Sequence, residues 1–147
     1  MKSKLLSETS GQRTFVVVLD TGEKAIRALT DFAVENRISA ASLTAIGAFE
    51  SATVGWFDFR LKSYRKIAVA EQSEVLSAIG DIAVADGGRP GLHIHAVLGL
   101  SDGQTRGGHL MEGFVRPTLE AIVVESPGYL RRTKREDLGI ALIDLDA

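Results

Sequence analysis

The 147-residue sequence contains no cysteine, which excludes disulfides, thiolate zinc ligands and a cysteine nucleophile. It also has no apolar run approaching the roughly 20 residues that a bilayer-spanning helix needs. Basic and acidic residues nearly balance: 17 basic and 19 acidic residues give a net charge of -2. This charge offers no general attraction to nucleic acid. We therefore expect a soluble cytoplasmic protein with no membrane association, in which a transition metal would bind to His, Asp or Glu.

Length and hydropathy patterning predict a single α+β domain. Residues 1–12 are mostly polar, so we expect a flexible N-terminal tail followed by one domain over 13–147, a length that buries about 70% of the unfolded surface. The β-branched run 15–19 leads into a helical period, for which Asp20 or Thr21 is the expected cap. Later links are too short for helical crossovers, which predicts a mostly antiparallel sheet with one main helix packed on it. The predicted strands are 41–49, 53–59, 64–70, 74–84, 92–100, 104–115, 119–125 and 140–145.

Histidine is scarce, and the three histidines of the chain, His93, His95 and His109, all lie in one segment. Residues i and i+2 of a strand share a face, so His93 and His95 project together. Residues 101–103, Ser-Asp-Gly, fit a three-residue hairpin loop with glycine in the left-handed position, and this register sets His109 opposite His95. A two-residue turn would put His109 on the other face, whereas a bulge at 107–108 would restore the shared face.

One histidine on a strand is more often a packed or surface residue than a metal ligand. The interpretation as a metal site therefore depends on the presence of all three histidines in one hairpin. Three neutral imidazoles with an open fourth position are typical of a zinc site. We therefore predict His93, His95 and His109 as ligands of zinc or another divalent transition metal.

Residues 91–115, GLHIHAVLGLSDGQTRGGHLMEGFV, resemble the histidine-rich hairpin of the plant and prokaryote conserved (PPC) domain family, whose bacterial members carry H-x-H, a D-G turn and then G-G-H-L. Upstream, TGEKAIRALTDFAVENRISAASLTAIGAFESATVGWFD is similar to the helix and following strand of the family, and SEVLSAIGDIA to a further segment. The resemblance covers about residues 13–145. It implies an α+β fold assembled as a homotrimer, with a metal, zinc, at the three histidine positions.

Plant relatives join this domain to AT-hook segments, whose arginines enter the minor groove of DNA. Here Gly88-Arg89-Pro90 matches only part of an AT-hook core, because Gly87 stands where the first arginine belongs. We interpret this segment as the turn that begins the histidine strand. Nucleic acid is therefore a weakly supported partner.

Other polar and aromatic residues have both a functional and an ordinary interpretation. Glu74 and Glu120 could each orient a metal ligand or act as a catalytic base, or could be ordinary paired carboxylates. The basic run 131–135 is interpreted as a solvated loop, and 60–66 as an exposed edge strand rather than a nucleic-acid site. Trp56 is expected in the core or in an interface.

Two functions follow from these features. The first is a metal-binding homotrimer with a regulatory or DNA-associated role, whose metal is structural or senses a small-molecule ligand. The alternative is a zinc-dependent enzyme, a hydrolase or lyase, that uses a water bound at the open position on a small molecule. A cupin fold is disfavoured because the glutamate of its signature is replaced by Gly99 or Leu100.

Overall fold

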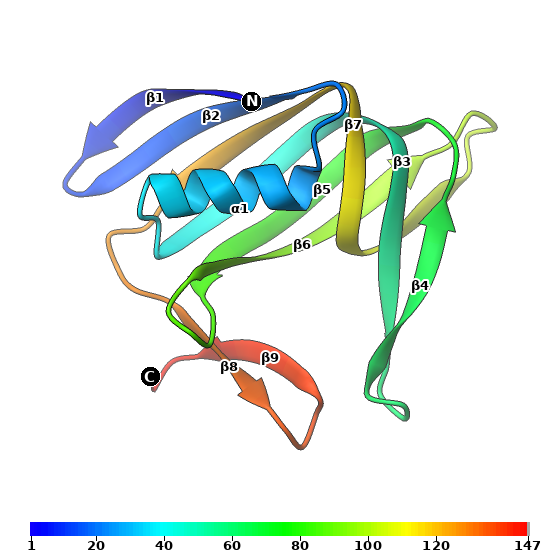
Figure 1. The fold of residues 1–147 in the computed structure, drawn as a ribbon. Helices are drawn as coiled ribbons and strands as arrows, with labels where there is room; N and C mark the ends of the chain where they lie inside the picture. The colour runs from blue at the N-terminus through cyan, green and yellow to red at the C-terminus, as the bar shows by residue number, and fades with distance from the viewer. Residues whose placement is uncertain (147) are drawn as a thin grey trace.

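The computed structural model describes residues 1–146. Their elements are β1 (Lys2–Thr9), β2 (Gln12–Asp20), α1 (Ala25–Glu35), β3 (Ala40–Asp58), β4 (Ser63–Val69), β5 (Ser73–Val84), β6 (Pro90–Gly99), β7 (Thr105–Glu125), β8 (Arg131–Arg135) and β9 (Ile140–Asp144). The nine strands of this region form one sheet, and α1 lies against it (Figure 1). This confirms the prediction of a mostly antiparallel sheet with one main helix. Within the same residues, no helix qualifies as a transmembrane segment.

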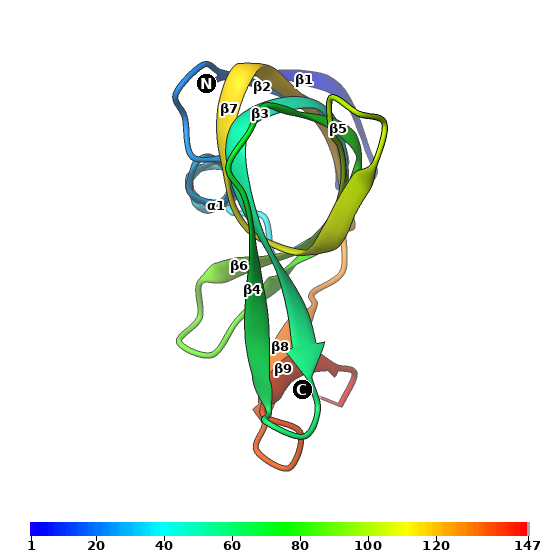
Figure 2. The same ribbon diagram turned by 90° about the vertical axis from the view of Figure 1, so that its right-hand side faces the viewer.

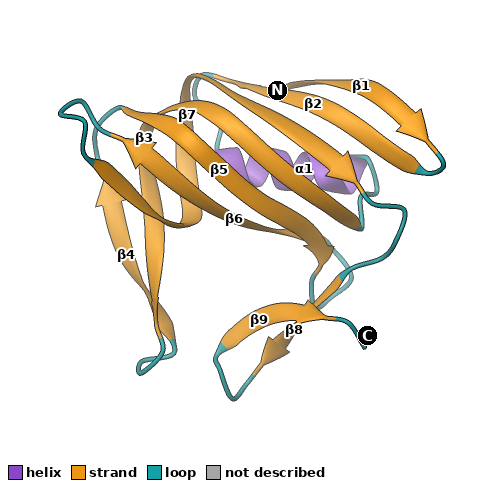
Figure 3. Ribbon diagram, turned by 180° about the vertical axis from the view of Figure 1, so that it is seen from behind, coloured by secondary structure: helices purple, strands orange, loops and turns teal. Residues whose placement is uncertain are grey.

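Four strands of the sheet close into a ring. β3 pairs with β5 and β7, and β6 pairs with the other edges of β5 and β7, so each of the four has two neighbours. Figure 2 looks into this ring from one end. β2 and then β1 extend the sheet beyond β7, as the view from behind shows (Figure 3). Closure pairs both edges of residues 95–99 of β6, whereas His93 pairs with β5 alone.

The apolar core lies between α1 and the sheet and continues into the ring. Phe32 of α1 meets Phe15 of β2 edge to face, with ring centroids 5.3 Å apart, so the odd-numbered residues of β2 face the helix. Burial of each such side chain contributes about 1.5–3 kcal/mol, so packing fixes the helix on the sheet. The largest fully buried side chains are Phe32, Phe49, Leu19, Leu29, Ile38, Leu43, Ile82, Ile94, Leu98, Leu119, Val17 and Val54.

Helix α1 begins later than predicted, and neither Asp20 nor Thr21 caps it. Asp20 is the last residue of β2, and Thr21 begins a turn that is bound to β7, where the backbone of Val115 exchanges two hydrogen bonds of 2.8 and 3.0 Å with the turn. A side chain of β7 instead accepts a hydrogen bond from the first turn of the helix: the Ile26 N–H donates to Glu112 Oε1 at 3.3 Å. The capping prediction was wrong because pairing with a distant strand outweighed the local preference.

The first twelve residues also differ from the tail expected. Lys2–Thr9 form β1, which runs antiparallel to β2, with Lys4 opposite Val16. Every side chain of β1 is exposed, so backbone hydrogen bonds to the edge of β2 hold the strand. A strand that buries no side chain leaves no apolar pattern in the sequence, which is why it was missed.

The predicted strands of residues 41–59 and 104–125 join in pairs to make the long strands β3 and β7. The turn-like residues between them lie at irregularities in the β3–β7 register. At Gly47 an added Cβ would lie 2.3 Å from the Thr118 carbonyl oxygen, so the missing side chain lets the two strands approach closely. The interruptions in hydropathy therefore mark irregularities within strands, and not turns between them.

The end of β3 and β4 form a hairpin that projects away from the ring (Figure 2). Among the described residues β4 pairs with β3 alone, which agrees with an exposed edge for residues 60–66. Trp56 lies on this hairpin, 52% exposed, with the Arg65 guanidinium 5.2 Å from its ring centroid. Of the two predictions for Trp56, the core position was therefore wrong and the interface position stays a prediction.

The basic run 131–135, expected as a loop, is strand β8, which pairs with β9 and meets β5 at Val84. The loop prediction relied on charge density, but the charges are balanced in the fold. Ion pairs join Arg131 to Asp86, Arg132 to Asp81, Lys134 to Glu136 and Arg135 to Asp137. Strand pairing is therefore compatible with a run of basic side chains.

Candidate metal centre

The β6–β7 hairpin has the three-residue loop that the sequence predicts. The Leu100 N–H donates to the Gln104 carbonyl at 2.9 Å, and Gly103 takes the left-handed conformation with a φ of 81°. His95 lies directly opposite His109, and the β6–β7 pairing continues without a register shift to the loop. The structure therefore confirms the predicted register and rules out the two-residue turn and the bulge.

The hairpin brings all three histidines together. His93 Nε2 lies 3.2 Å from His95 Nε2, and one ring nitrogen from each of the three histidines lies within 4.8 Å of the others. Two nitrogens bound to one tetrahedral zinc ion at about 2.0–2.1 Å are roughly 3.3 Å apart, so the first pair already has the required spacing. Tyr64 of β4 stacks on His109, with ring centroids 4.8 Å apart, and covers that imidazole from the hairpin side.

Burial and like charge keep two of these imidazoles neutral. Burial, followed by the proximity of His93, His95 and Arg132, lowers the pKa of His109 from 6.5 to about 4. Burial and then Arg132 lower the pKa of His93, against a smaller opposing effect of Asp81. At neutral pH both side chains therefore offer an unprotonated nitrogen, which is the form that binds a metal.

The donor set suits a transition metal. His109 Nδ1 is buried and has no hydrogen-bond partner among the described residues, although burying such an atom unpaired costs about 1–3 kcal/mol. Imidazole nitrogen is a ligand for zinc, copper, nickel and iron, whereas calcium and magnesium require oxygen ligands. The three side chains therefore fit the zinc-type ion that the sequence predicts.

A second layer of polar side chains lies behind His93, and sequence reasoning missed it. Asp81 of β5 is the cross-strand neighbour of His93, and Arg132 of β8 places one guanidinium nitrogen 2.8 Å from Asp81 Oδ1 and 3.4 Å from His93 Nδ1. A guanidinium only donates hydrogen bonds, so Arg132 donates to the Asp81 carboxylate and faces Nδ1 of His93 as a donor. Arg132 therefore links His93 to Asp81, and, after burial, its positive charge contributes to the lowered pKa of His93.

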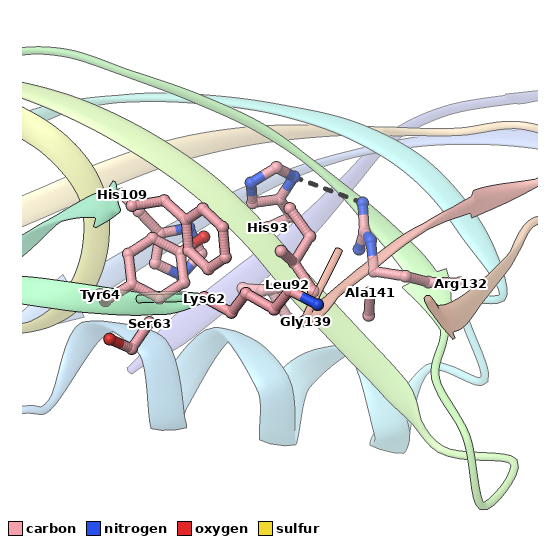
Figure 4. Close-up of a pocket in the computed structure, with 11 residues that line it drawn as sticks. Lys62, Ser63, Tyr64, Leu92, His93, His109, Arg132, Gly139 and Ala141 are labelled. Carbon is pink, nitrogen blue, oxygen red and sulfur yellow. Dashed lines mark hydrogen bonds between the residues drawn. The ribbon is translucent and has the colours of Figure 1, made fainter. Parts of the chain in front are cut away.

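A cavity of about 320 Å³ opens beside His93 and His109 (Figure 4). Three separate parts of the chain make its walls: the β3–β4 hairpin, the β6–β7 hairpin, and the C-terminal hairpin β8–β9. The lining residues are Phe57, Lys62, Ser63, Tyr64, Leu92, His93, His109, Arg132, Gly139, Ile140 and Ala141. The candidate metal centre therefore borders a space large enough for a small molecule.

The two candidate glutamates are not brought to the histidines. Glu74 lies at the start of β5, opposite Gly99, and lines a different hollow near the β6–β7 loop. Glu120 lies on β7 opposite Ile46, on the exposed face of the sheet. Neither side chain belongs to the histidine cluster or lines its cavity. Both are exposed carboxylates, and neither has the ion-pair partner among the described residues that the ordinary interpretation expected.

Comparison with known proteins gives a consistent result. The profile of the Plants and Prokaryotes Conserved (PCC) domain matches residues 6–127. A candidate DNA-binding protein of Bacteroides thetaiotaomicron is 26% identical, with 96% of each chain covered and a TM-score of 0.87. A plant- and prokaryote-conserved protein of Pyrococcus horikoshii is 29% identical, with 94% of this chain and 97% of that chain covered and a TM-score of 0.84.

A metal-containing protein of Archaeoglobus fulgidus is 34% identical to this chain. The comparison covers 97% of this chain and 98% of that chain, with a TM-score of 0.82. No protein of curated function matches the sequence. The segment that forms β8 and β9 lies beyond the end of the matched profile, although it supplies one wall of the cavity.

Proposed function

We propose, from the premise that this chain belongs to the Plants and Prokaryotes Conserved domain family, that it is a metal-binding module in which three histidines hold one divalent transition metal ion, zinc by preference. The ligands are His93, His95 and His109. When bound, the ion would supply a Lewis acid with room for one further ligand. The module acts as a homotrimer in the cytoplasm and has a regulatory role.

The observation that carries this proposal is the convergence of three imidazoles from one hairpin, with the nitrogens of His93 and His95 at metal-ligand spacing. The unpaired Nδ1 of His109 and the absence of cysteine support nitrogen ligands. The metal-containing relative from Archaeoglobus fulgidus supports the metal itself.

Metal analysis of the purified protein tests the proposal. After incubation with zinc and desalting, the wild type should retain about one zinc per chain, and His93→Ala and His109→Gln should retain far less. Gln104→Ala is the matched control, because Gln104 is an exposed residue of the same hairpin. Absence of zinc from the wild type, or full retention in both histidine variants, would overturn the metal site.

Self-association has its own support in the exposed face of the sheet. Ile46 and Ile79 are each 61% exposed, and Val97 and Ile122 are exposed on the same face, opposite α1. Exposed apolar side chains gathered on one face of a sheet are typical of a protein interface. We therefore assign the trimer contact to this face, and light scattering of the protein in solution should give the mass of three chains.

A DNA-associated role receives less support from this chain than from its relatives. The relative from Bacteroides thetaiotaomicron is a candidate DNA-binding protein. In this chain, however, four cations of the run 131–135 have acidic partners, and the net charge is -2. Regulation without direct DNA contact is therefore the function we favour, and a gel-shift assay at physiological salt should show no complex.

The alternative of a zinc-dependent hydrolase or lyase is favoured by one observation, the cavity beside the histidines. Such an enzyme commonly needs a general base near the metal, and no described residue lining this cavity is aspartate or glutamate. A binding role therefore accounts better for the cavity. Chelator-sensitive turnover of small ester or amide substrates would reverse this preference.

A further inference from the structure

We propose that the cavity beside the histidines binds a small carboxylate with an apolar body. This inference rests on the proposed function, because the metal centre borders the same cavity. It goes further by naming the chemical class of the ligand and the side chains that select it.

The charge of the cavity is positive. Lys62 and Arg132 line it, and no described lining residue is acidic. Asp81 behind the wall engages the Arg132 guanidinium, whereas Lys62 forms no ion pair with any described residue. A bound metal would add further positive charge. An anionic ligand therefore suits the site, and a carboxylate both pairs with a cation and binds a zinc-type ion.

The remaining walls are apolar or aromatic. Phe57 and Tyr64 of the β3–β4 hairpin pack edge to face, with ring centroids 5.0 Å apart, and Leu92 and Ile140 lie on other sides of the cavity. The volume of about 320 Å³ is at the small end of the range for ligand pockets. A small ligand with an apolar body fits these walls better than a highly charged phosphate.

Two hairpin tips meet over the cavity. At Gly139 of the β8–β9 turn, an added Cβ would lie 2.7 Å from the Cβ of Lys62 in the β3–β4 turn, and Gly139 has a φ of 77°. Only a residue without a side chain permits this close approach. The contact places Lys62 between the hairpins, where Figure 4 shows its side chain among the lining residues. The contact therefore sets the backbone of Lys62 beside the cavity, and its exposed side chain lines the cavity wall.

Calorimetric titration of the full chain with benzoate tests this inference. We expect saturable binding to the zinc-loaded protein and weaker binding to the chelator-treated protein. Lys62→Gln should weaken benzoate binding about ten-fold or more in both forms, because it removes a charge-assisted contact. Lys66→Gln is the matched control, since Lys66 is an exposed residue of the same hairpin that does not line the cavity. Zinc content measured for each variant separates loss of the metal from loss of the ligand.

Each outcome bears on the inference. Equal affinity of Lys62→Gln and the wild type, equal binding of neutral benzamide, or stronger binding of phosphate would overturn a carboxylate site, as would no benzoate binding by zinc-loaded protein. If the protein binds no zinc, the proposed function fails. Benzoate binding that depends on Lys62 would then still support the carboxylate site, and its absence would overturn that site as well.

Discussion

Replacing Gly108 by alanine should disturb the metal centre without touching any of its ligands. Gly108 precedes His109 on β7, at the point where the strand lies against β3. An added Cβ would lie 2.5 Å from the Gly55 carbonyl oxygen, whereas close carbon–oxygen contacts in sheets are about 3.3–3.6 Å. The two backbones must therefore separate by roughly 1 Å, or β7 must rotate at this residue.

The cost follows from this displacement. Overpacking against rigid backbone typically costs about 1–3 kcal/mol. For a chain of this length each kcal/mol lowers the unfolding temperature by about 2–4 °C, so we expect a decrease of about 3–10 °C. Because the shift falls on the residue before His109, zinc affinity should decrease by about ten-fold or more, as it does when the supporting residues of a metal ligand are changed.

Two measurements check this prediction: thermal unfolding of the metal-free protein by circular dichroism, and competition for zinc with a chromophoric chelator. Gly103→Ala is the conformational control, because its Cβ would meet no atom within 4 Å but its φ is 81°. It should cost about 1 kcal/mol and leave zinc affinity unchanged. Gly128→Ala, with open space and no positive φ, should change neither quantity. Equal zinc affinities of Gly108→Ala and Gly103→Ala would refute the reasoning.

Three further predictions concern the core, the pH dependence and the sheet face. Arg13→Met leaves the buried Glu125 carboxylate unpaired and should lower the free energy of unfolding by about 2–4 kcal/mol in urea, whereas a loss below about 0.5 kcal/mol would contradict this role. The pKa of His109 is about 4 in the folded protein, whereas its ordinary value of 6.5 applies to the unfolded chain. Between pH 4 and pH 6.5 the unfolded chain therefore binds more protons than the folded protein. Unfolding free energy of the metal-free protein should therefore be greatest above pH 6.5 and decrease toward pH 4, and His109→Gln should show a shallower decrease in the same urea assay. Ile79→Lys places a charge in the exposed apolar patch and should reduce the mass measured by light scattering, while an unchanged mass would exclude this face as the contact.

The histidine hairpin could be predicted because its geometry is local. Strand parity joins His93 to His95, and the loop 101–103 contains the glycine that fixes its conformation, so counting from the loop sets His109 in place. The start of α1 could not be predicted in the same way. The N–H group of Ile26 in the first turn of α1 donates to Glu112, which is 86 residues away in the sequence. Local preference carries no information about such a partner.

Of the two side chains behind His93, one could be predicted from the sequence and the other could not. Asp81 was within reach of the sequence, because counting back from the turn at residues 85–89 sets it opposite His93. Arg132 was not, since its position depends on β8 meeting β5 at one pair of residues, Val84 and Arg131. A run of basic residues gives no sign of which one turns inward. The cavity is likewise a product of three distant segments and has no local signature.

The histidines and the other walls of the cavity lie on structurally different parts of the molecule. The proposed ligands His95 and His109 lie where β6 and β7 have neighbours on both sides, and His93 pairs with β5. The cavity is completed by the β3–β4 and β8–β9 hairpins, which project from that ring and meet through Lys62 and Gly139. Strands with two neighbours open less readily than hairpins held by few contacts. The ligand geometry of the metal is therefore fixed in advance, while the wall that selects a carboxylate can adjust. This difference favours a ligand-responsive metal centre over a purely structural one, because a structural metal needs no adjustable wall beside it.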